Sequence, residues 1–76
     1  MATVDGTITV VQESRFQMTD DDGASHLFTL SPNAAAEPSQ LAPLAARQAR
    51  IRVRYREGDN VIGFVAQSIH VLGAGA

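Results

Sequence analysis

Hydrophobic and polar residues alternate along most of the chain, and this alternation predicts β-strands. In residues 3–13, Val4, Ile8 and Val10 share one parity, and the other parity is polar as far as Thr9. Val11 directly follows Val10, which indicates a place where both faces become covered. β-Branched residues at a period of two are typical of a strand with one buried face. Gly6 interrupts the apolar parity, so we expect a bend or bulge there.

The next two alternating segments form a predicted hairpin. Residues 14–19 and 25–30 place most of their large apolar side chains on one parity, with Leu27 on the other, and Asp22 and Gly23 lie between the two segments. An Asp-Gly pair favours a type I′ turn, because both central residues of that turn need a positive φ.

The pattern changes in residues 38–47, where a short helix is expected after a loop. Pro38 suits the first turn of a helix, since its missing N–H is not needed there. Leu41 and Leu44 fall at helical spacing. Pro43 limits the regular part to one or two turns.

Two more strands are predicted at residues 49–57 and 61–72, with a turn at residues 57–60 between them. The apolar residues of the last segment change parity halfway along it. A bulge near Gln67 and Ser68 would bring both groups to the same face.

The order of three strands, a helix and two strands resembles the OB-fold, a five-stranded Greek-key barrel. The resemblance concerns architecture and covers nearly the whole chain. It implies one all-β domain over residues 1–72, a flexible tail at 73–76, and a fourth strand beside the first and fifth. An SH3-like barrel is the alternative, although that fold usually has no helix of this length between its third and fourth strands. The expected core is Ile8, Val10, Phe16, Met18, Phe28, Leu30, Leu41, Leu44, Ile51, Val53, Tyr55, Ile62, Phe64 and Ile69.

Composition agrees with a small globular domain. The chain has 76 residues, 45% of them hydrophobic, and no cysteine, which excludes disulfides and thiolate metal sites. No apolar run reaches the length of about 20 residues that a membrane span needs, and the N-terminus lacks the features of a signal peptide. We therefore expect a soluble cytoplasmic protein with no membrane association. Oligomerisation stays open.

Charge is unevenly distributed along the chain, and this distribution indicates a candidate binding surface. The net charge is −2, yet residues 39–76 carry five of the six arginines. Four of them, at positions 50, 52, 54 and 56, alternate with Ile51, Val53 and Tyr55. On a strand these arginines would stand outward with their Cα atoms roughly 6.6 Å apart, and the apolar residues would face the core.

Like charges at this spacing repel one another, so the arginines need partners. In an OB-like barrel the first strand would offer Asp5 and Glu13 as cross-strand carboxylates. The alternative is an external anion, either nucleic-acid phosphate or an acidic protein, because the guanidinium group binds both in a bidentate manner.

Other chemistry finds little support. The usual OB binding face, on strands two and three, lacks outward aromatic residues for base stacking, since Phe16, Phe28 and Phe64 have inward parity. The sequence "DDDG" lacks the spacing of a calcium loop. His26 and His70 without cysteine make no zinc motif, and no nucleophile elbow or phosphate loop is present. We expect no catalysis, metal or cofactor.

The sequence therefore predicts a non-enzymatic binding module. The first hypothesis is recognition of a polyanion, such as the nucleic-acid backbone, and its candidate residues are Arg47, Arg50, Arg52, Arg54 and Arg56. The second is a protein-interaction or self-association module, in which the arginines form only structural salt bridges on the surface.

Overall fold

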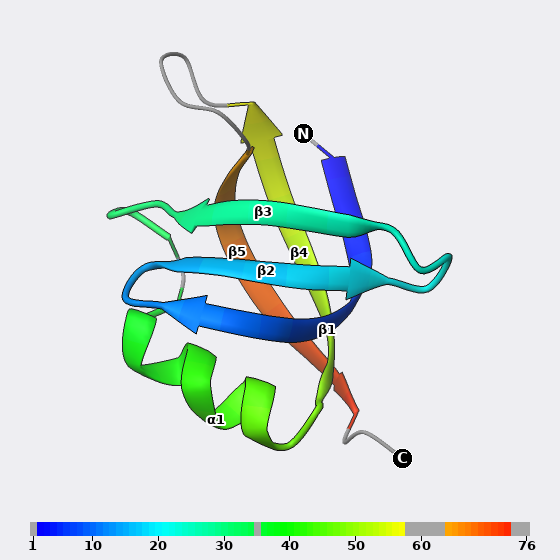
Figure 1. The fold of residues 1–76 in the computed structure, drawn as a ribbon. Helices are drawn as coiled ribbons and strands as arrows, with labels where there is room; N and C mark the ends of the chain where they lie inside the picture. Colours follow the sequence, from blue (N-terminus) through cyan, green and yellow to red (C-terminus); the bar gives the residue numbers. More distant parts are fainter. Residues whose placement is uncertain (1, 35, 58–63, 74–76) are drawn as a thin grey trace.

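The computed structural model describes residues 2–34, 36–57 and 64–73. Five strands and one short helix account for most of these residues (Figure 1). Their bounds are β1 Ala2–Gln12, β2 Arg15–Asp20, β3 Ser25–Leu30, the 3₁₀ turn η1 Pro38–Gln40, α1 Leu41–Ala46, β4 Arg50–Glu57 and β5 Phe64–Gly73. The predicted turn at 57–60 is outside the described residues beyond Glu57, and so is the tail beyond Gly73.

The strands form a closed barrel in the order β1-β2-β3-β5-β4. β1 pairs with β2 along one part of its length and with β4 along another, and β3 pairs with β5 in parallel. This confirms the predicted all-β class, a five-stranded barrel with one short helix between β3 and β4. The strand order is consistent with an OB-like architecture.

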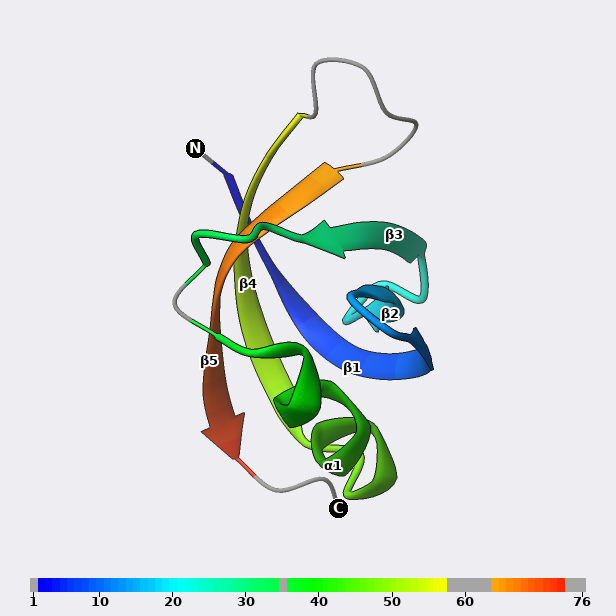
Figure 2. The same cartoon turned by 90° about the vertical axis from the view of Figure 1, so that its left-hand side faces the viewer.

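The helix lies across one end of the barrel, between β1 and β5 (Figure 2). Pro38 begins η1, and the backbone N–H of Glu37 donates to Oε1 of Gln40 at 2.8 Å. α1 follows directly, with Leu41 and Leu44 buried against the core. The helix ends where Gln48 adopts a φ of 51°.

The buried core contains most of the residues expected there. Tyr55, Phe64 and Ile69 are partly buried and pack against it, whereas Ile62 lies outside the described residues. The buried set comprises Ile8, Phe16, Met18, Phe28, Leu30, Leu41, Leu44, Ala49, Ile51, Val53 and Ala66.

The assignment of Val10 to the core is wrong. Val10 is 48% exposed, and Val11 packs against the core instead. The register of β1 against β2 shifts between Ile8 and Val10, so a bulge reverses the parity beyond Thr9. The bulge predicted near Gln67 is confirmed, because the register of β4 against β5 shifts there.

Gly6 does not form a bulge, which was one of the two features predicted there. The register of β1 is regular at Gly6, but a Cβ atom there would lie 2.1 Å from the carbonyl oxygen of Thr19. Glycine is therefore needed because the backbones of β1 and β2 approach closely at this point.

The hairpin between β2 and β3 is confirmed, but the predicted type I′ turn is wrong. Gly23 has a φ of 87°, while Asp22 does not have a positive φ. The N–H of Gly23 donates to the carbonyl of Asp20 at 3.0 Å, and the N–H of Asp20 donates to the carbonyl of Ala24 at 2.8 Å. This is a type I turn followed by a glycine bulge, which needs a positive φ only at Gly23.

Candidate binding surfaces

The four alternating arginines of β4 all lie on the outside of the barrel. Their side chains are exposed, whereas Ile51 and Val53 between them are completely buried. The β4 sequence therefore divides into one buried and one exposed row, as strand periodicity requires. The four arginines differ, however, in what they contact.

Arg52 is paired with a carboxylate of the neighbouring strand. It lies opposite Asp5 of β1, and its Nε and Nη2 atoms donate to the two oxygens of Asp5 at 2.8 and 3.0 Å. These hydrogen bonds lower the pKa of Asp5 and raise that of Arg52. The bidentate geometry occupies the Nε–Nη2 edge of the Arg52 guanidinium group.

Arg50 is paired with a residue that the sequence did not single out as its partner. Its Nε donates to Oδ1 of Asp21 at 3.3 Å, and its Nη2 bonds Oδ2 of the same carboxylate. The β2–β3 loop reaches Arg50 because Gly6 pairs with Asp20 and the adjacent Thr7 pairs with Arg50.

Glu13 was predicted as a partner, and the structure does not place it in that role. It lies in the turn after β1, with a φ of 55°, whereas β4 pairs with the opposite half of β1, from Ala2 to Thr7. Within the part of the chain that the structure describes, Glu13 makes no ion pair.

Arg54 and Arg56 form the other half of the row. Neither makes an ion pair with any residue in the described ranges, although Nη1 of Arg56 donates to the backbone carbonyl of Glu57 at 3.2 Å. Arg47 lies apart from β4, at the end of α1. The five candidate arginines therefore form no single uniform surface.

The "DDDG" segment has a structural role in its hairpin. Oδ1 of Asp20 accepts hydrogen bonds from the N–H groups of Asp22 and Ala24, both at 2.9 Å, and its Oδ2 lies 2.7 Å from Nε2 of His26. The bond to His26, followed by that from Ala24, lowers the pKa of Asp20. Among the described residues, no three His, Cys, Asp or Glu side chains are grouped so that they could hold a metal ion.

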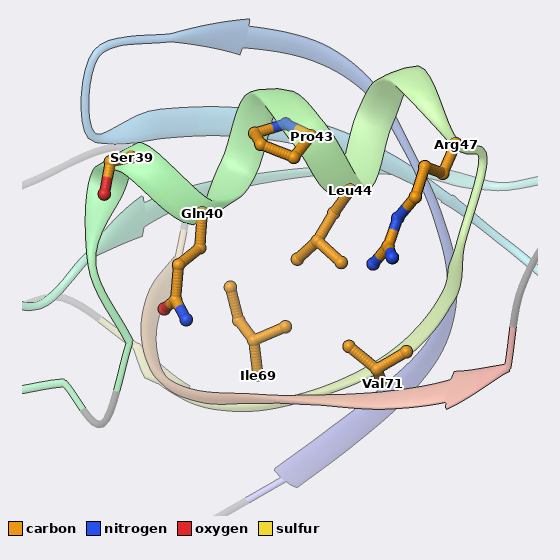
Figure 3. A pocket seen from close by; sticks show the side chains of 7 residues that line it. All are labelled: Ser39, Gln40, Pro43, Leu44, Arg47, Ile69 and Val71. Carbon is orange, nitrogen blue, oxygen red and sulfur yellow. The ribbon is translucent and has the colours of Figure 1, made fainter.

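A groove that was not predicted from the sequence runs between the helix and the last strand. Its volume is about 390 Å³. Figure 3 shows Leu44 of α1 pointing toward Ile69 and Val71 of β5, with Arg47 at one end. Val71 is 55% exposed, and the adjacent Leu72 is 39% exposed. Among the described residues, its lining is Ser39, Gln40, Pro43, Leu44, Arg47, Ile69 and Val71.

A smaller hollow lies on the outer face of β1, β2 and β3, with a volume of about 150 Å³. Val10 and Leu27 are its exposed apolar residues, and Arg15 lies beside them. Phe16 is the one aromatic residue lining it and is only 1% exposed. This face therefore presents no ring on which a nucleic-acid base could stack.

Comparisons with known proteins add no family to this description. No family model matches the chain, and neither a curated protein nor a solved structure matches it significantly. None of the helices in the described ranges has the length and hydrophobicity to cross a membrane.

Proposed function

We propose that this OB-like barrel is a non-enzymatic binding module that contacts a protein partner through the groove between α1 and β5. The observation that supports this most is the groove lining, where Pro43, Leu44, Ile69 and Val71 surround one solvent-accessible space. Burial of apolar surface is the main favourable term in most protein association. A groove of this kind offers that gain without a rearrangement of the core.

The ion pairs of the β4 arginines support a protein partner indirectly, because they weaken the case for the alternative partner, a nucleic acid or another polyanion. Arg50 and Arg52 already have carboxylate partners, and a phosphate would have to displace Asp21 or Asp5. The net charge of −2 also opposes long-range attraction to nucleic acid. A polyanion would therefore meet only part of the row.

Arg54 and Arg56, which make no ion pair in the described ranges, support a second candidate function, the binding of a polyanion. A fluorescence titration with a single-stranded oligonucleotide at several salt concentrations tests it. Contact with two phosphates predicts a log–log slope of about −1.4. Absence of binding at low salt, or binding that an Arg54→Glu/Arg56→Glu variant retains, would rule this candidate out.

Photo-crosslinking in the native host cells tests the main proposal. A benzophenone amino acid replaces Val71 in the groove, and in separate variants it replaces Leu27 on β3 or Arg54 on β4. Leu27 is the matched control, because it is 51% exposed and also lies on a strand. We expect a protein adduct, either a different protein or a second copy, mainly from position 71. Equal adducts from positions 71 and 27 would contradict the proposal.

A further inference from the structure

The strand that borders the groove has an unpaired edge. β5 pairs with β4 from Phe64 to Gly73, but on its other edge it pairs with β3 only from Phe64 to Ala66. There the N–H of Ser31 donates to the carbonyl of Ala66 at 3.0 Å, and the chain then leaves for η1. Beyond Ala66, none of the described strands pairs with this edge.

The open edge is long enough to pair with another strand. Residues 67–73 extend over roughly 20 Å at about 3.3 Å per residue. Exposed strand edges are usually protected by charged side chains, proline or a covering element. Here α1 lies nearby, but the groove separates it from Ile69 and Val71 (Figure 3).

An occupant of this site would have to pair with the open edge of β5 and also fill the apolar groove. A strand added to β5 would satisfy the backbone groups of the edge, and every second side chain would point the same way as Ile69 and Val71, toward Leu44. A helix would fill the apolar space but leave the edge unpaired. The occupant that meets both demands is an extended peptide.

The charge of the groove adds a further requirement. Of the residues that the structure describes, Arg47 is the one charged residue that lines the groove, and none of the carboxylates does. The Arg47 side chain is exposed and points toward the groove beside Val71 (Figure 3). A carboxylate on the occupant would therefore find a guanidinium partner at the helix end and no repelling acid.

We propose that this groove binds an extended segment of a partner protein by strand addition to residues 67–73. The segment carries apolar side chains at alternate positions and a carboxylate that pairs with Arg47. The proposal rests on the protein-binding function above and specifies the partner. It differs from self-association, in which a second copy of the chain would occupy the groove.

The test is selection of random twelve-residue peptides displayed on phage against the full chain. We expect enriched peptides with alternating apolar residues and at least one acidic residue. The best of them, made synthetically, should protect from hydrogen exchange those amides of residues 67–73 that face the open edge of β5 rather than β4. Absence of enrichment, helical spacing of the apolar residues, or binding without amide protection in β5 would overturn the proposal.

Groove variants make the test specific. Val71→Asp and Arg47→Glu should each weaken the selected peptide about tenfold, because an unpaired or repelling carboxylate then faces it. Leu27→Asp is the matched control, since Leu27 is 51% exposed on another face, and it should bind like the wild type. Equal affinity of Val71→Asp and Leu27→Asp would overturn the proposal.

Light scattering separates the proposal from self-association. A dimer that Val71→Asp converts to a monomer would overturn the peptide proposal while leaving a protein-binding groove in place. Conversely, a failed peptide selection together with a position-71 crosslink would overturn only the strand-addition step. A concentration-independent monomer that binds the selected peptide supports the proposal.

Discussion

Two regions of the barrel differ in whether their side chains already have partners. Asp21 of the β2–β3 turn and Asp5 of β1 pair with Arg50 and Arg52 of β4, so these charges largely neutralise one another. Between α1 and β5, Leu44 and Val71 face a space that no described side chain fills. The charged face was conspicuous in the sequence, and the groove was not. Charge density alone is therefore a poor guide to the binding surface of this protein.

The largest predicted effect concerns the close approach of the β1 and β2 backbones at Gly6. Gly6→Ala should destabilise the protein by about 3 kcal/mol, because the new Cβ would meet the backbone of Thr19 and Asp20 at 2.1 and 2.8 Å. Urea unfolding measures the loss. Gly73→Ala is the control, since a Cβ there meets nothing within 4 Å, and equal stability of the two variants would refute the close approach at Gly6.

The residues that the sequence predicted well are those governed by local periodicity. Alternation alone separated Ile51 and Val53 from the arginines of β4, and the change of parity predicted the bulge near Gln67. In β1 the bulge comes between Ile8 and Val10, and its sequence sign, the adjacent apolar pair Val10 and Val11, was interpreted as a place where both faces become covered. Val10 was therefore misplaced.

The candidate sites depend on contacts between distant segments, which periodicity does not report. Asp5 was predicted as an arginine partner because it lies on the strand next to β4, but Asp21 required the register of β1 with both of its neighbours. The groove required the position of α1 relative to β5. Its one sequence indication was the apolar pair Val71 and Leu72, which exceeds what the core needs.

The helix that forms one wall of the groove ends at a strained residue. Gln48 has a φ of 51°, and the N–H groups of Gln48 and Ala49 donate to the carbonyls of Ala45 and Leu44, both at 3.1 Å. This is a Schellman motif, in which glycine is preferred at the position of Gln48. Gln48→Gly should therefore stabilise the protein by about 0.5–1 kcal/mol.

Thermal unfolding measures this gain, which corresponds to an increase in Tm of about 2–8 °C for a domain of this size. Gln48→Ala is the control, because it removes the side chain but keeps the backbone strain, and its Tm should stay near that of the wild type. An increase in Tm for Gln48→Ala as large as that for Gln48→Gly would attribute the effect to the side chain instead.

Acid should reduce the stability that the carboxylates of Asp5 and Asp20 contribute to the folded protein. Hydrogen bonds from Arg52 lower the pKa of Asp5, and the bond to His26 contributes most to the lowered pKa of Asp20. Between the lowered native pKa values and the unfolded pKa, the native state thus binds fewer protons than the unfolded state. The stability from these carboxylates is fully present above their unfolded pKa of about 3.9 and is lost as the pH falls through the native values.

Urea midpoints at pH 6, 4 and 3 measure this loss. Asp20→Asn should show a shallower decrease than the wild type below pH 4, since its amide cannot ionise but still accepts from Asp22 and Ala24. Asp22→Asn is the matched control, because Asp22 makes no ion pair among the described residues. A decrease of the same size in Asp20→Asn and Asp22→Asn would refute the role of Asp20.

The smallest predicted effect divides the arginine row itself. Arg52→Gln should lower the urea midpoint at low salt, because Asp5 loses the two guanidinium donors at 2.8 and 3.0 Å. Arg54→Gln should leave the midpoint unchanged, because Arg54 has no carboxylate partner in the described ranges. Both arginines are exposed on the same strand, so each variant controls for the other. High salt should reduce the difference, since it screens exposed charges. Equal midpoints at low salt would mean that pairing with Asp5 does not distinguish the two halves of the row, and all four arginines would then be candidates for an external anion.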